Sequence, residues 1–93
     1  MVTAIVLVQA ERGMVNPVAE ALAERDEISE VYSVSGGYDL VAIIRVANND
    51  ELARFVTEFM AHVDGIGHTE TMLAFRAYSR HDLEGMFGIG VEP

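Results

Sequence analysis

Apolar residues along this chain fall into six blocks, whose spacing is that of a strand or that of a helix. Four blocks are rich in β-branched or alternating apolar residues and predict strands, at residues 2–9, 31–35, 40–46 and 70–78. Two blocks have apolar residues three and four positions apart and predict helices, at residues 16–25 and 49–63. The order strand, helix, strand, strand, helix, strand predicts a βαββαβ unit.

The second half of this pattern repeats the first at a distance of 38 residues, from Ala4 to Ala42 and from Ile28 to Ile66. A duplicated strand–helix–strand unit predicts an α+β, ferredoxin-like fold, in which two helices cover one face of a four-stranded antiparallel sheet. Because this fold hosts many unrelated functions, the function must be sought in particular residues.

Turn and cap residues bound the predicted elements. Asn16 precedes Pro17 and is expected to cap the first helix. Asn48 and Glu51 have the spacing of a capping box, which predicts the start of the second helix. Asp64 and Gly65 are expected to end that helix.

Both faces of the central strands are apolar. In the first strand, Ala4 and Val6 point to one side of the sheet, and Ile5 and Leu7 point to the other. Two helices cover only one face, so the second face of a monomer would be a large exposed apolar patch. We therefore expect a two-fold dimer that packs sheet against sheet as an αβ sandwich or barrel.

Charge and composition exclude several classes of function. The net charge is −9, and the six basic residues are all arginines. This balance argues against direct binding to nucleic acid or to an anionic membrane. The sequence has no cysteine, which excludes disulfides and thiolate chemistry. The first apolar block has the features of a strand rather than of a signal peptide, so a cytoplasmic protein is expected.

The length of 93 residues suits one domain, expected at residues 1–78 and followed by a C-terminal tail at residues 79–93. In the tail, Ser79 and Asp82 have capping-box spacing, which predicts a short helix. The apolar residues of that helix are Leu83, Met86 and Phe87.

Catalytic and metal motifs are missing from the sequence. The three histidines lack metal-ligand spacing, and no glycine-rich phosphate loop follows a strand. We therefore expect no metal and no cofactor.

The turn between the two central blocks contains chemistry that a turn does not need. Gly36 and Gly37 can expose backbone N–H groups that hold a carboxylate, and Asp39 can pair with an ammonium group. These are the two charged groups of a free α-amino acid. Turn geometry alone also explains the glycines, and Asp39 could simply bond nearby backbone groups. Thr69 and Thr71 share one face of the last strand, where threonine is also a good strand former.

The run from Val31 to Leu40, VYSVSGGYDL, resembles the V-x-G-x-Y-D-L hairpin of the Lrp/AsnC regulators of amino-acid metabolism. The segments Asp64-Gly65-Ile66 and Thr69-Glu70-Thr71 resemble the entry to that family's last strand. The resemblance implies the family's effector domain, the RAM domain, which dimerises through its sheets and associates further into tetramers or octamers.

In that family a small effector, typically an amino acid, binds near the hairpin between dimers. The resemblance implies that the effector is contacted by six residues of this chain, namely Gly36, Gly37, Tyr38, Asp39, Thr69 and Thr71. Family members usually begin with a helix-turn-helix DNA-binding domain, whereas this sequence starts with a strand at Val2. The resemblance is thus to stand-alone members that lack the DNA-binding domain.

Three hypotheses follow. The leading one is a non-enzymatic, amino-acid-binding module that modulates transcription indirectly, through mixed oligomers with full-length family members. The second is a cofactor-free αβ-barrel enzyme, a monooxygenase or isomerase, with Arg45 and Arg76 as candidate polar groups. The third is a dimerising scaffold with a vestigial site.

Overall fold

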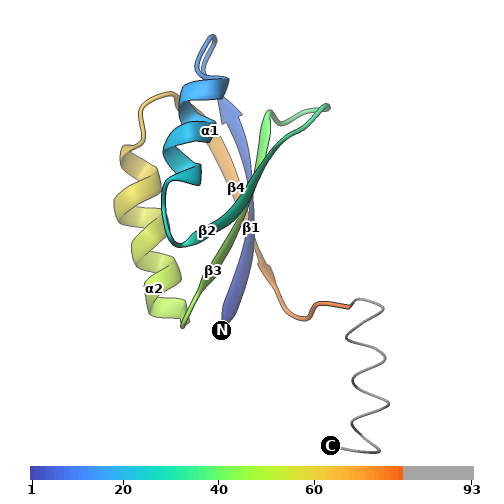
Figure 1. Cartoon of the computed structure of the whole chain (residues 1–93), viewed down its shortest axis with the longest axis vertical. Helices are drawn as coiled ribbons and strands as arrows, with labels where there is room; N and C mark the ends of the chain where they lie inside the picture. Colours follow the sequence, from blue (N-terminus) through green and yellow to red (C-terminus); the bar gives the residue numbers. More distant parts are fainter. Residues whose placement is uncertain (79–93) are drawn as a thin grey trace, which may run out of the picture.

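Four strands form one antiparallel sheet in the order β2-β3-β1-β4, and the helical segments cover one of its faces (Figure 1). The computed structural model describes residues 1–78, so the predicted tail helix at 79–93 lies outside the described residues. The elements are β1 (Val2–Ala10), α1 (Val15–Ala23), β2 (Ile28–Ser33), β3 (Leu40–Val46), α2 (Asn49–Arg54) and β4 (Ile66–Ala74). The predicted ferredoxin-like βαββαβ fold is confirmed.

The core lies between the sheet and the helices, and the central strands supply most of it. Alternate residues of β1 and β3 point to the helix-covered face, where Val6 pairs with Ala42 and both are fully buried. Leu22 of α1 and Phe55, which follows α2, close the core from the helix side. Burying such side chains contributes roughly 1.5–3 kcal/mol each.

The internal repeat predicted from the sequence is visible in the structure. The 38-residue shift carries the start of β1 at Val2 to the start of β3 at Leu40. It likewise carries the start of β2 at Ile28 to the start of β4 at Ile66. The two β-α-β halves interleave, because β1 of the first half pairs with both strands of the second.

The predicted bounds of two strands are wrong at both ends, and β2 spans Ile28–Ser33 rather than 31–35. Strand β2 begins at Ile28 rather than at residue 31, because an irregularity between Ile28 and Glu30 interrupts the alternation that marks a strand. Strand β4 spans Ile66–Ala74 rather than 70–78. Gly67 and His68 have the character of loop residues, but pairing with β1 draws them into the sheet.

The two helix starts differ from each other in how they are capped. Helix α1 begins at Val15 after Met14, which makes no side-chain cap, so the prediction that Asn16 caps this helix is wrong. At α2 the predicted cap is confirmed, because Asn48 Oδ1 accepts a hydrogen bond from the Glu51 N–H at 2.9 Å. The α2 helix then continues through a π-helical turn at Phe55–Phe59 and a 3₁₀ turn at Met60–His62.

The face of the sheet away from the helices, here called the open face, carries apolar side chains without cover from the described chain. Ile5 and Leu7 of β1 lie beside Ile43 and Val41 of β3 on this face, and all four are partly exposed. Among the helices of residues 1–78, none is long and apolar enough to cross a membrane.

Candidate functional site

The hairpin between β2 and β3 is anchored to the end of β1. The Asp39 N–H donates to the Val8 carbonyl at 2.9 Å, and the Asp39 carbonyl accepts from the Val34 N–H at 3.0 Å. Gly36, with φ +112°, takes the left-handed conformation that a side chain disfavours. No neighbouring atom lies within 4 Å of where a Cβ would stand on Gly36 or Gly37. The tip of the hairpin is therefore open to an incoming ligand.

The Asp39 carboxylate bridges two strands. Its Oδ2 accepts a hydrogen bond from the Ala10 N–H at 2.9 Å. Ala10 lies where the register between β1 and β4 shifts, and such an irregularity leaves ladder groups in need of another partner. Among the described residues, the second carboxylate oxygen has no hydrogen-bond donor. Asp39 thus combines a structural bond with one free oxygen at the hairpin.

Tyr38 links the hairpin to β4. Its hydroxyl donates to Glu70 Oε1 at 2.8 Å, and its ring stacks on His68 with 6.3 Å between ring centroids. This hydrogen bond is the main cause that raises the pKa of Tyr38 above its ordinary value of 10.0. On the other side, Gln9 Nε2 donates to the Gly37 carbonyl at 2.7 Å. The hairpin is consequently held by side chains from two neighbouring strands.

Three residues of this cluster, Gln9, His68 and Glu70, were not among the predicted site residues. The sheet order brings them together, because Gln9 pairs with His68 across the β1–β4 ladder and Glu70 follows two positions later on the same face. With β4 expected to begin at Glu70, the sequence offered no signal for this pairing.

Thr69 and Thr71 lie on the opposite face from this cluster. They pair with Val8 and Val6 of β1, which are buried under the helices, so both threonines point to the helix-covered face. The structure therefore brings the four predicted hairpin residues together but does not bring the two threonines to them within one chain.

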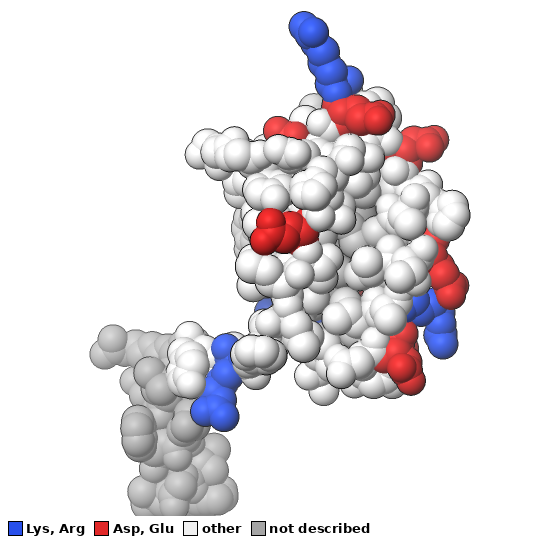
Figure 2. Space-filling view, turned by 180° about the vertical axis from the view of Figure 1, so that it is seen from behind, with Lys and Arg blue, Asp and Glu red and all other residues white. Residues whose placement is uncertain are grey.

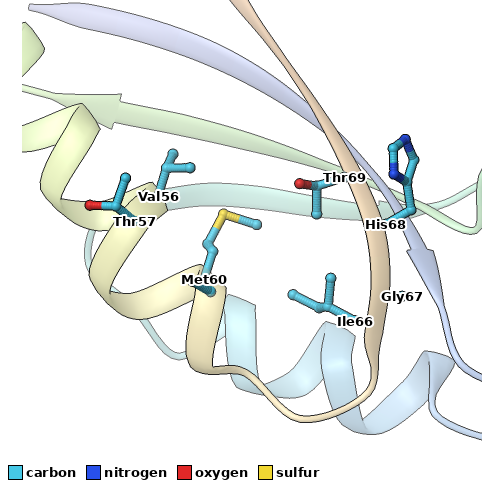
Figure 3. A pocket seen from close by; sticks show the side chains of 8 residues that line it. Val56, Thr57, Met60, Ile66, Gly67, His68 and Thr69 are labelled. Atoms are coloured by element: carbon cyan, nitrogen blue, oxygen red, sulfur yellow. The ribbon is translucent and has the colours of Figure 1, made fainter.

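A groove lies on the helix side of β4. It is lined by Val56, Thr57, Met60 and Ala61 from the helical layer and by residues 66–69 of β4. We call it the β4 groove; its volume is about 530 Å³, within the range of roughly 300–1,000 Å³ typical of ligand sites. Figure 3 shows the side chains of Val56, Met60, Ile66 and Thr69 facing the same space. The walls combine apolar side chains with the polar residues Thr57, His68 and Thr69.

The residues proposed for an enzyme do not line this groove. Arg45 is exposed on β3, and Arg76 lies beyond the end of β4, where its guanidinium is 3.5 Å from the Tyr78 hydroxyl. Arg76 was expected inside the last strand, and that expectation is wrong.

Charge is spread over the surface. On the face shown in Figure 2, acidic side chains lie around the margin of a largely uncharged area, and basic side chains do not cluster. In the part of the chain that the structure describes, no three histidine, aspartate or glutamate side chains are grouped to hold a metal ion.

The duplicated βαββαβ fold and its polar hairpin place the chain among the ferredoxin-like α+β domains. Its sequence matches the family described as the Lrp/AsnC ligand binding domain over residues 3–83. The chain belongs to this family, as the hairpin motif predicted.

The relatives include transcriptional regulators that are longer than this chain. The chain is 36% identical over 75 residues to the HTH-type transcriptional regulator FL11 of Pyrococcus horikoshii. The match covers 81% of this chain and 49% of that regulator. The chain thus spans about half the length of this relative, and the shared half is the ligand-binding domain.

Solved structures share the fold of this chain. The crystal structure of TTHA0845 from Thermus thermophilus is 46% identical, with a TM-score of 0.80, and the match covers 86% of this chain and all of that one. The transcriptional regulator NMB0573 from Neisseria meningitidis, solved as a complex with L-Met, has the same fold, with a TM-score of 0.77 at 11% identity. That match covers 85% of this chain and 53% of the regulator.

Proposed function

We propose that the chain binds a free amino acid at the hairpin and, in response, changes its association with other chains of its family. The observation that carries this proposal is Asp39, which is fixed by Ala10 through one carboxylate oxygen, in the same hairpin as the open glycine tip. A carboxylate held in this way can pair with an ammonium group, and exposed backbone N–H groups can hold a carboxylate. The L-Met complex of the N. meningitidis regulator is consistent with this ligand class.

A second copy of the chain completes the proposed site. Thr69 and Thr71 lie on the face of the sheet opposite the Tyr38 cluster, so they can approach a ligand at the hairpin only from another copy. The apolar open face around Leu7 and Ile43 supports a sheet-to-sheet dimer. We propose that such dimers associate further, into tetramers or octamers, and that the ligand binds between them.

The route to transcription is proposed to be indirect. The relatives of known class are helix-turn-helix regulators, which points to a non-enzymatic role, and the family match of this chain covers only their ligand-binding half. The net charge of −9 disfavours direct contact with DNA. Mixed oligomers with a full-length regulator in the cytoplasm would let this chain alter DNA occupancy without touching DNA.

Calorimetric titration with each of the twenty amino acids tests the ligand class. The variants are Asp39→Asn, which retains an oxygen acceptor for Ala10 but removes the charge, and Asp26→Asn, which removes one exposed charge elsewhere. We expect saturable heat with at least one amino acid, a loss of affinity of at least tenfold in Asp39→Asn, and unchanged affinity in Asp26→Asn.

Other outcomes identify the alternatives. No heat across the panel from the folded, oligomeric protein would favour the scaffold hypothesis, and equal affinity in both variants would remove Asp39 from the site. The regulatory step is tested separately, by mixing the chain with a full-length family regulator and measuring the mass of the complex. Failure to form a mixed oligomer would contradict the indirect route but not ligand binding.

A further inference from the structure

The described chain beyond β4 exposes large apolar side chains. Leu73, near the end of β4, is 45% exposed, and Phe75 and Tyr78, which follow the strand, are 94% and 65% exposed. Aromatic side chains in such positions contribute to stability only when they are buried, so their exposure indicates a missing contact. These residues lead directly into the tail at residues 79–93.

The β4 groove is a second surface with apolar side chains that no described element covers. β4 is an edge strand, and on the helix-covered face of the sheet it is the strand with exposed Thr71 and Leu73. The groove floor is apolar at Val56, Met60 and Ile66. A short amphipathic segment lying along β4 would extend the helical layer over this strand. It would remove Leu73 and the apolar groove floor from water.

The tail has the composition of such a segment. Leu83, Met86 and Phe87 have the spacing of one helix face, and Ser79 and Asp82 have capping-box spacing before them. The family match ends at residue 83, and all of TTHA0845 is covered by 86% of this chain, so the fold itself does not require the remaining residues.

We infer that the tail of one copy docks in the β4 groove of a second copy of this chain. The direction in which the chain leaves β4 favours the groove of a second copy over the groove of the same copy. In Figure 1 the segment after β4 leaves on the side of the sheet opposite the helices, away from its own groove. The nine residues from Phe75 to Leu83 can span about 30 Å when extended, enough to cross a neighbouring sheet that packs about 10 Å away.

This inference goes beyond ligand binding, because it assigns a partner to a surface on the other face from the Tyr38 cluster. The hairpin tip stays free, but the tail covers Thr69 and Thr71, so tail docking and the proposed contact of these threonines with a ligand exclude each other.

Disulfide trapping between two single-cysteine variants tests the exchange in the full-length chain. The sequence has no cysteine, so only introduced thiols react. One variant carries Phe87→Cys and a larger tag; the other carries Ala61→Cys at an exposed position in the groove wall. The matched control is Ala23→Cys, an exposed alanine at the end of α1, which packs on β2 at the other edge of the sheet.

After mixing and oxidation, we expect a mixed disulfide dimer on a non-reducing gel for the Phe87→Cys and Ala61→Cys pair, at least fivefold more abundant than with Ala23→Cys. Adding Leu83→Asp to the tagged chain should reduce the trapped dimer to the control level. Equal trapping at both alanines would overturn the inference. A doubly substituted chain, Ala61→Cys with Phe87→Cys, that closes its disulfide within one copy would also overturn it.

Discussion

At the scale of single residues, Asp39 has a structural role in the hairpin and is also the central residue of the proposed site. Asp39 uses one oxygen to satisfy the Ala10 N–H and leaves the other free. The Tyr38 hydroxyl donates a hydrogen bond to Glu70, and the Tyr38 ring stacks on His68. These contacts hold the residues of the proposed site in place without a ligand, which would lower the entropy lost on binding.

Replacing Asp39 separates its two roles. We expect Asp39→Ala to lower the free energy of unfolding by about 1–3 kcal/mol, because the Ala10 N–H loses its acceptor in a partly buried place. Asp39→Asn should cost less than half as much, since its amide oxygen can still accept that bond. Urea unfolding of both variants measures the difference. Equal losses would show that the charge, and not the Ala10 bond, stabilises the hairpin.

The Tyr38–Glu70 bond predicts a pH effect. The hydrogen bond raises the pKa of Tyr38, so the folded chain holds this proton more tightly than the unfolded chain. Its contribution to stability is complete below pH about 10 and is lost as the pH rises from there through the folded pKa. In Glu70→Gln, the ultraviolet titration of tyrosinate should shift to lower pH; Tyr38→Phe should abolish that shift. A titration unchanged by Glu70→Gln would contradict the bond.

At the scale of elements, the bounds of a strand were predicted best where turn and cap residues mark both ends of an apolar run. The apolar run of β3 lies between a glycine turn and Asn48, and its predicted bounds of 40–46 agree with the structure. The starts of β2 and β4 were missed because an irregular register at Ile28 and the loop-like residues Gly67 and His68 mask the alternation. Local spacing does not reveal which strands become neighbours.

The same limit applies to the candidate site. The hairpin residues could be named from the sequence, because glycines and an aspartate in a turn have recognisable chemistry. Gln9 and Glu70 could not, because only the β1–β4 pairing brings them to Tyr38 and Gly37. The two faces of β4 likewise became known only with its register, which separates Thr69 from Glu70.

The turn that ends the second helical segment depends on one glycine. Gly65 has φ +97°, and a Cβ there would lie 2.8 Å from Met14 Cβ and 2.9 Å from Val18 Cγ2. We expect Gly65→Ala to cost about 2–5 kcal/mol, since backbone strain and overpacking of the core add. Gly36→Ala, with positive φ but open space, should cost about 1–2 kcal/mol. Gly37→Ala should be nearly neutral.

Thermal or urea unfolding of these three glycine variants ranks them directly. A Gly65→Ala chain as stable as Gly37→Ala would show that the backbone between the helical segment and β4 rearranges freely.

At the scale of the whole molecule, the two faces of the sheet differ. Helices cover one face, and the described chain leaves the other uncovered. Helices bury Val6 and Ala42 completely, whereas Leu7 and Ile43, one position along each strand, are left partly exposed. The proposed sheet-to-sheet dimer would need no separate interface element, because the alternation of each strand would supply core and interface together.

A charge placed on the open face tests the proposed dimer. We expect Ile43→Glu to shift sedimentation toward the monomer mass, because two copies of the carboxylate would be buried at the sheet-to-sheet contact without partners. Ala23→Glu, at the exposed end of α1, is the matched control and should sediment as the unmodified chain does. An unchanged mass for Ile43→Glu would place the interface elsewhere.

The interleaved order of the strands has a consequence for synthesis on the ribosome. β1 pairs with β3 and β4, and not with β2, so residues 1–33 cannot form a sheet among themselves when they emerge. The apolar segment from Val2 to Val8 has no partner strand until β3 has been synthesised. At typical elongation rates, the roughly forty further residues take about 2–8 s. During that interval the nascent chain offers a segment that chaperones recognise, and β4 can close the sheet only afterwards.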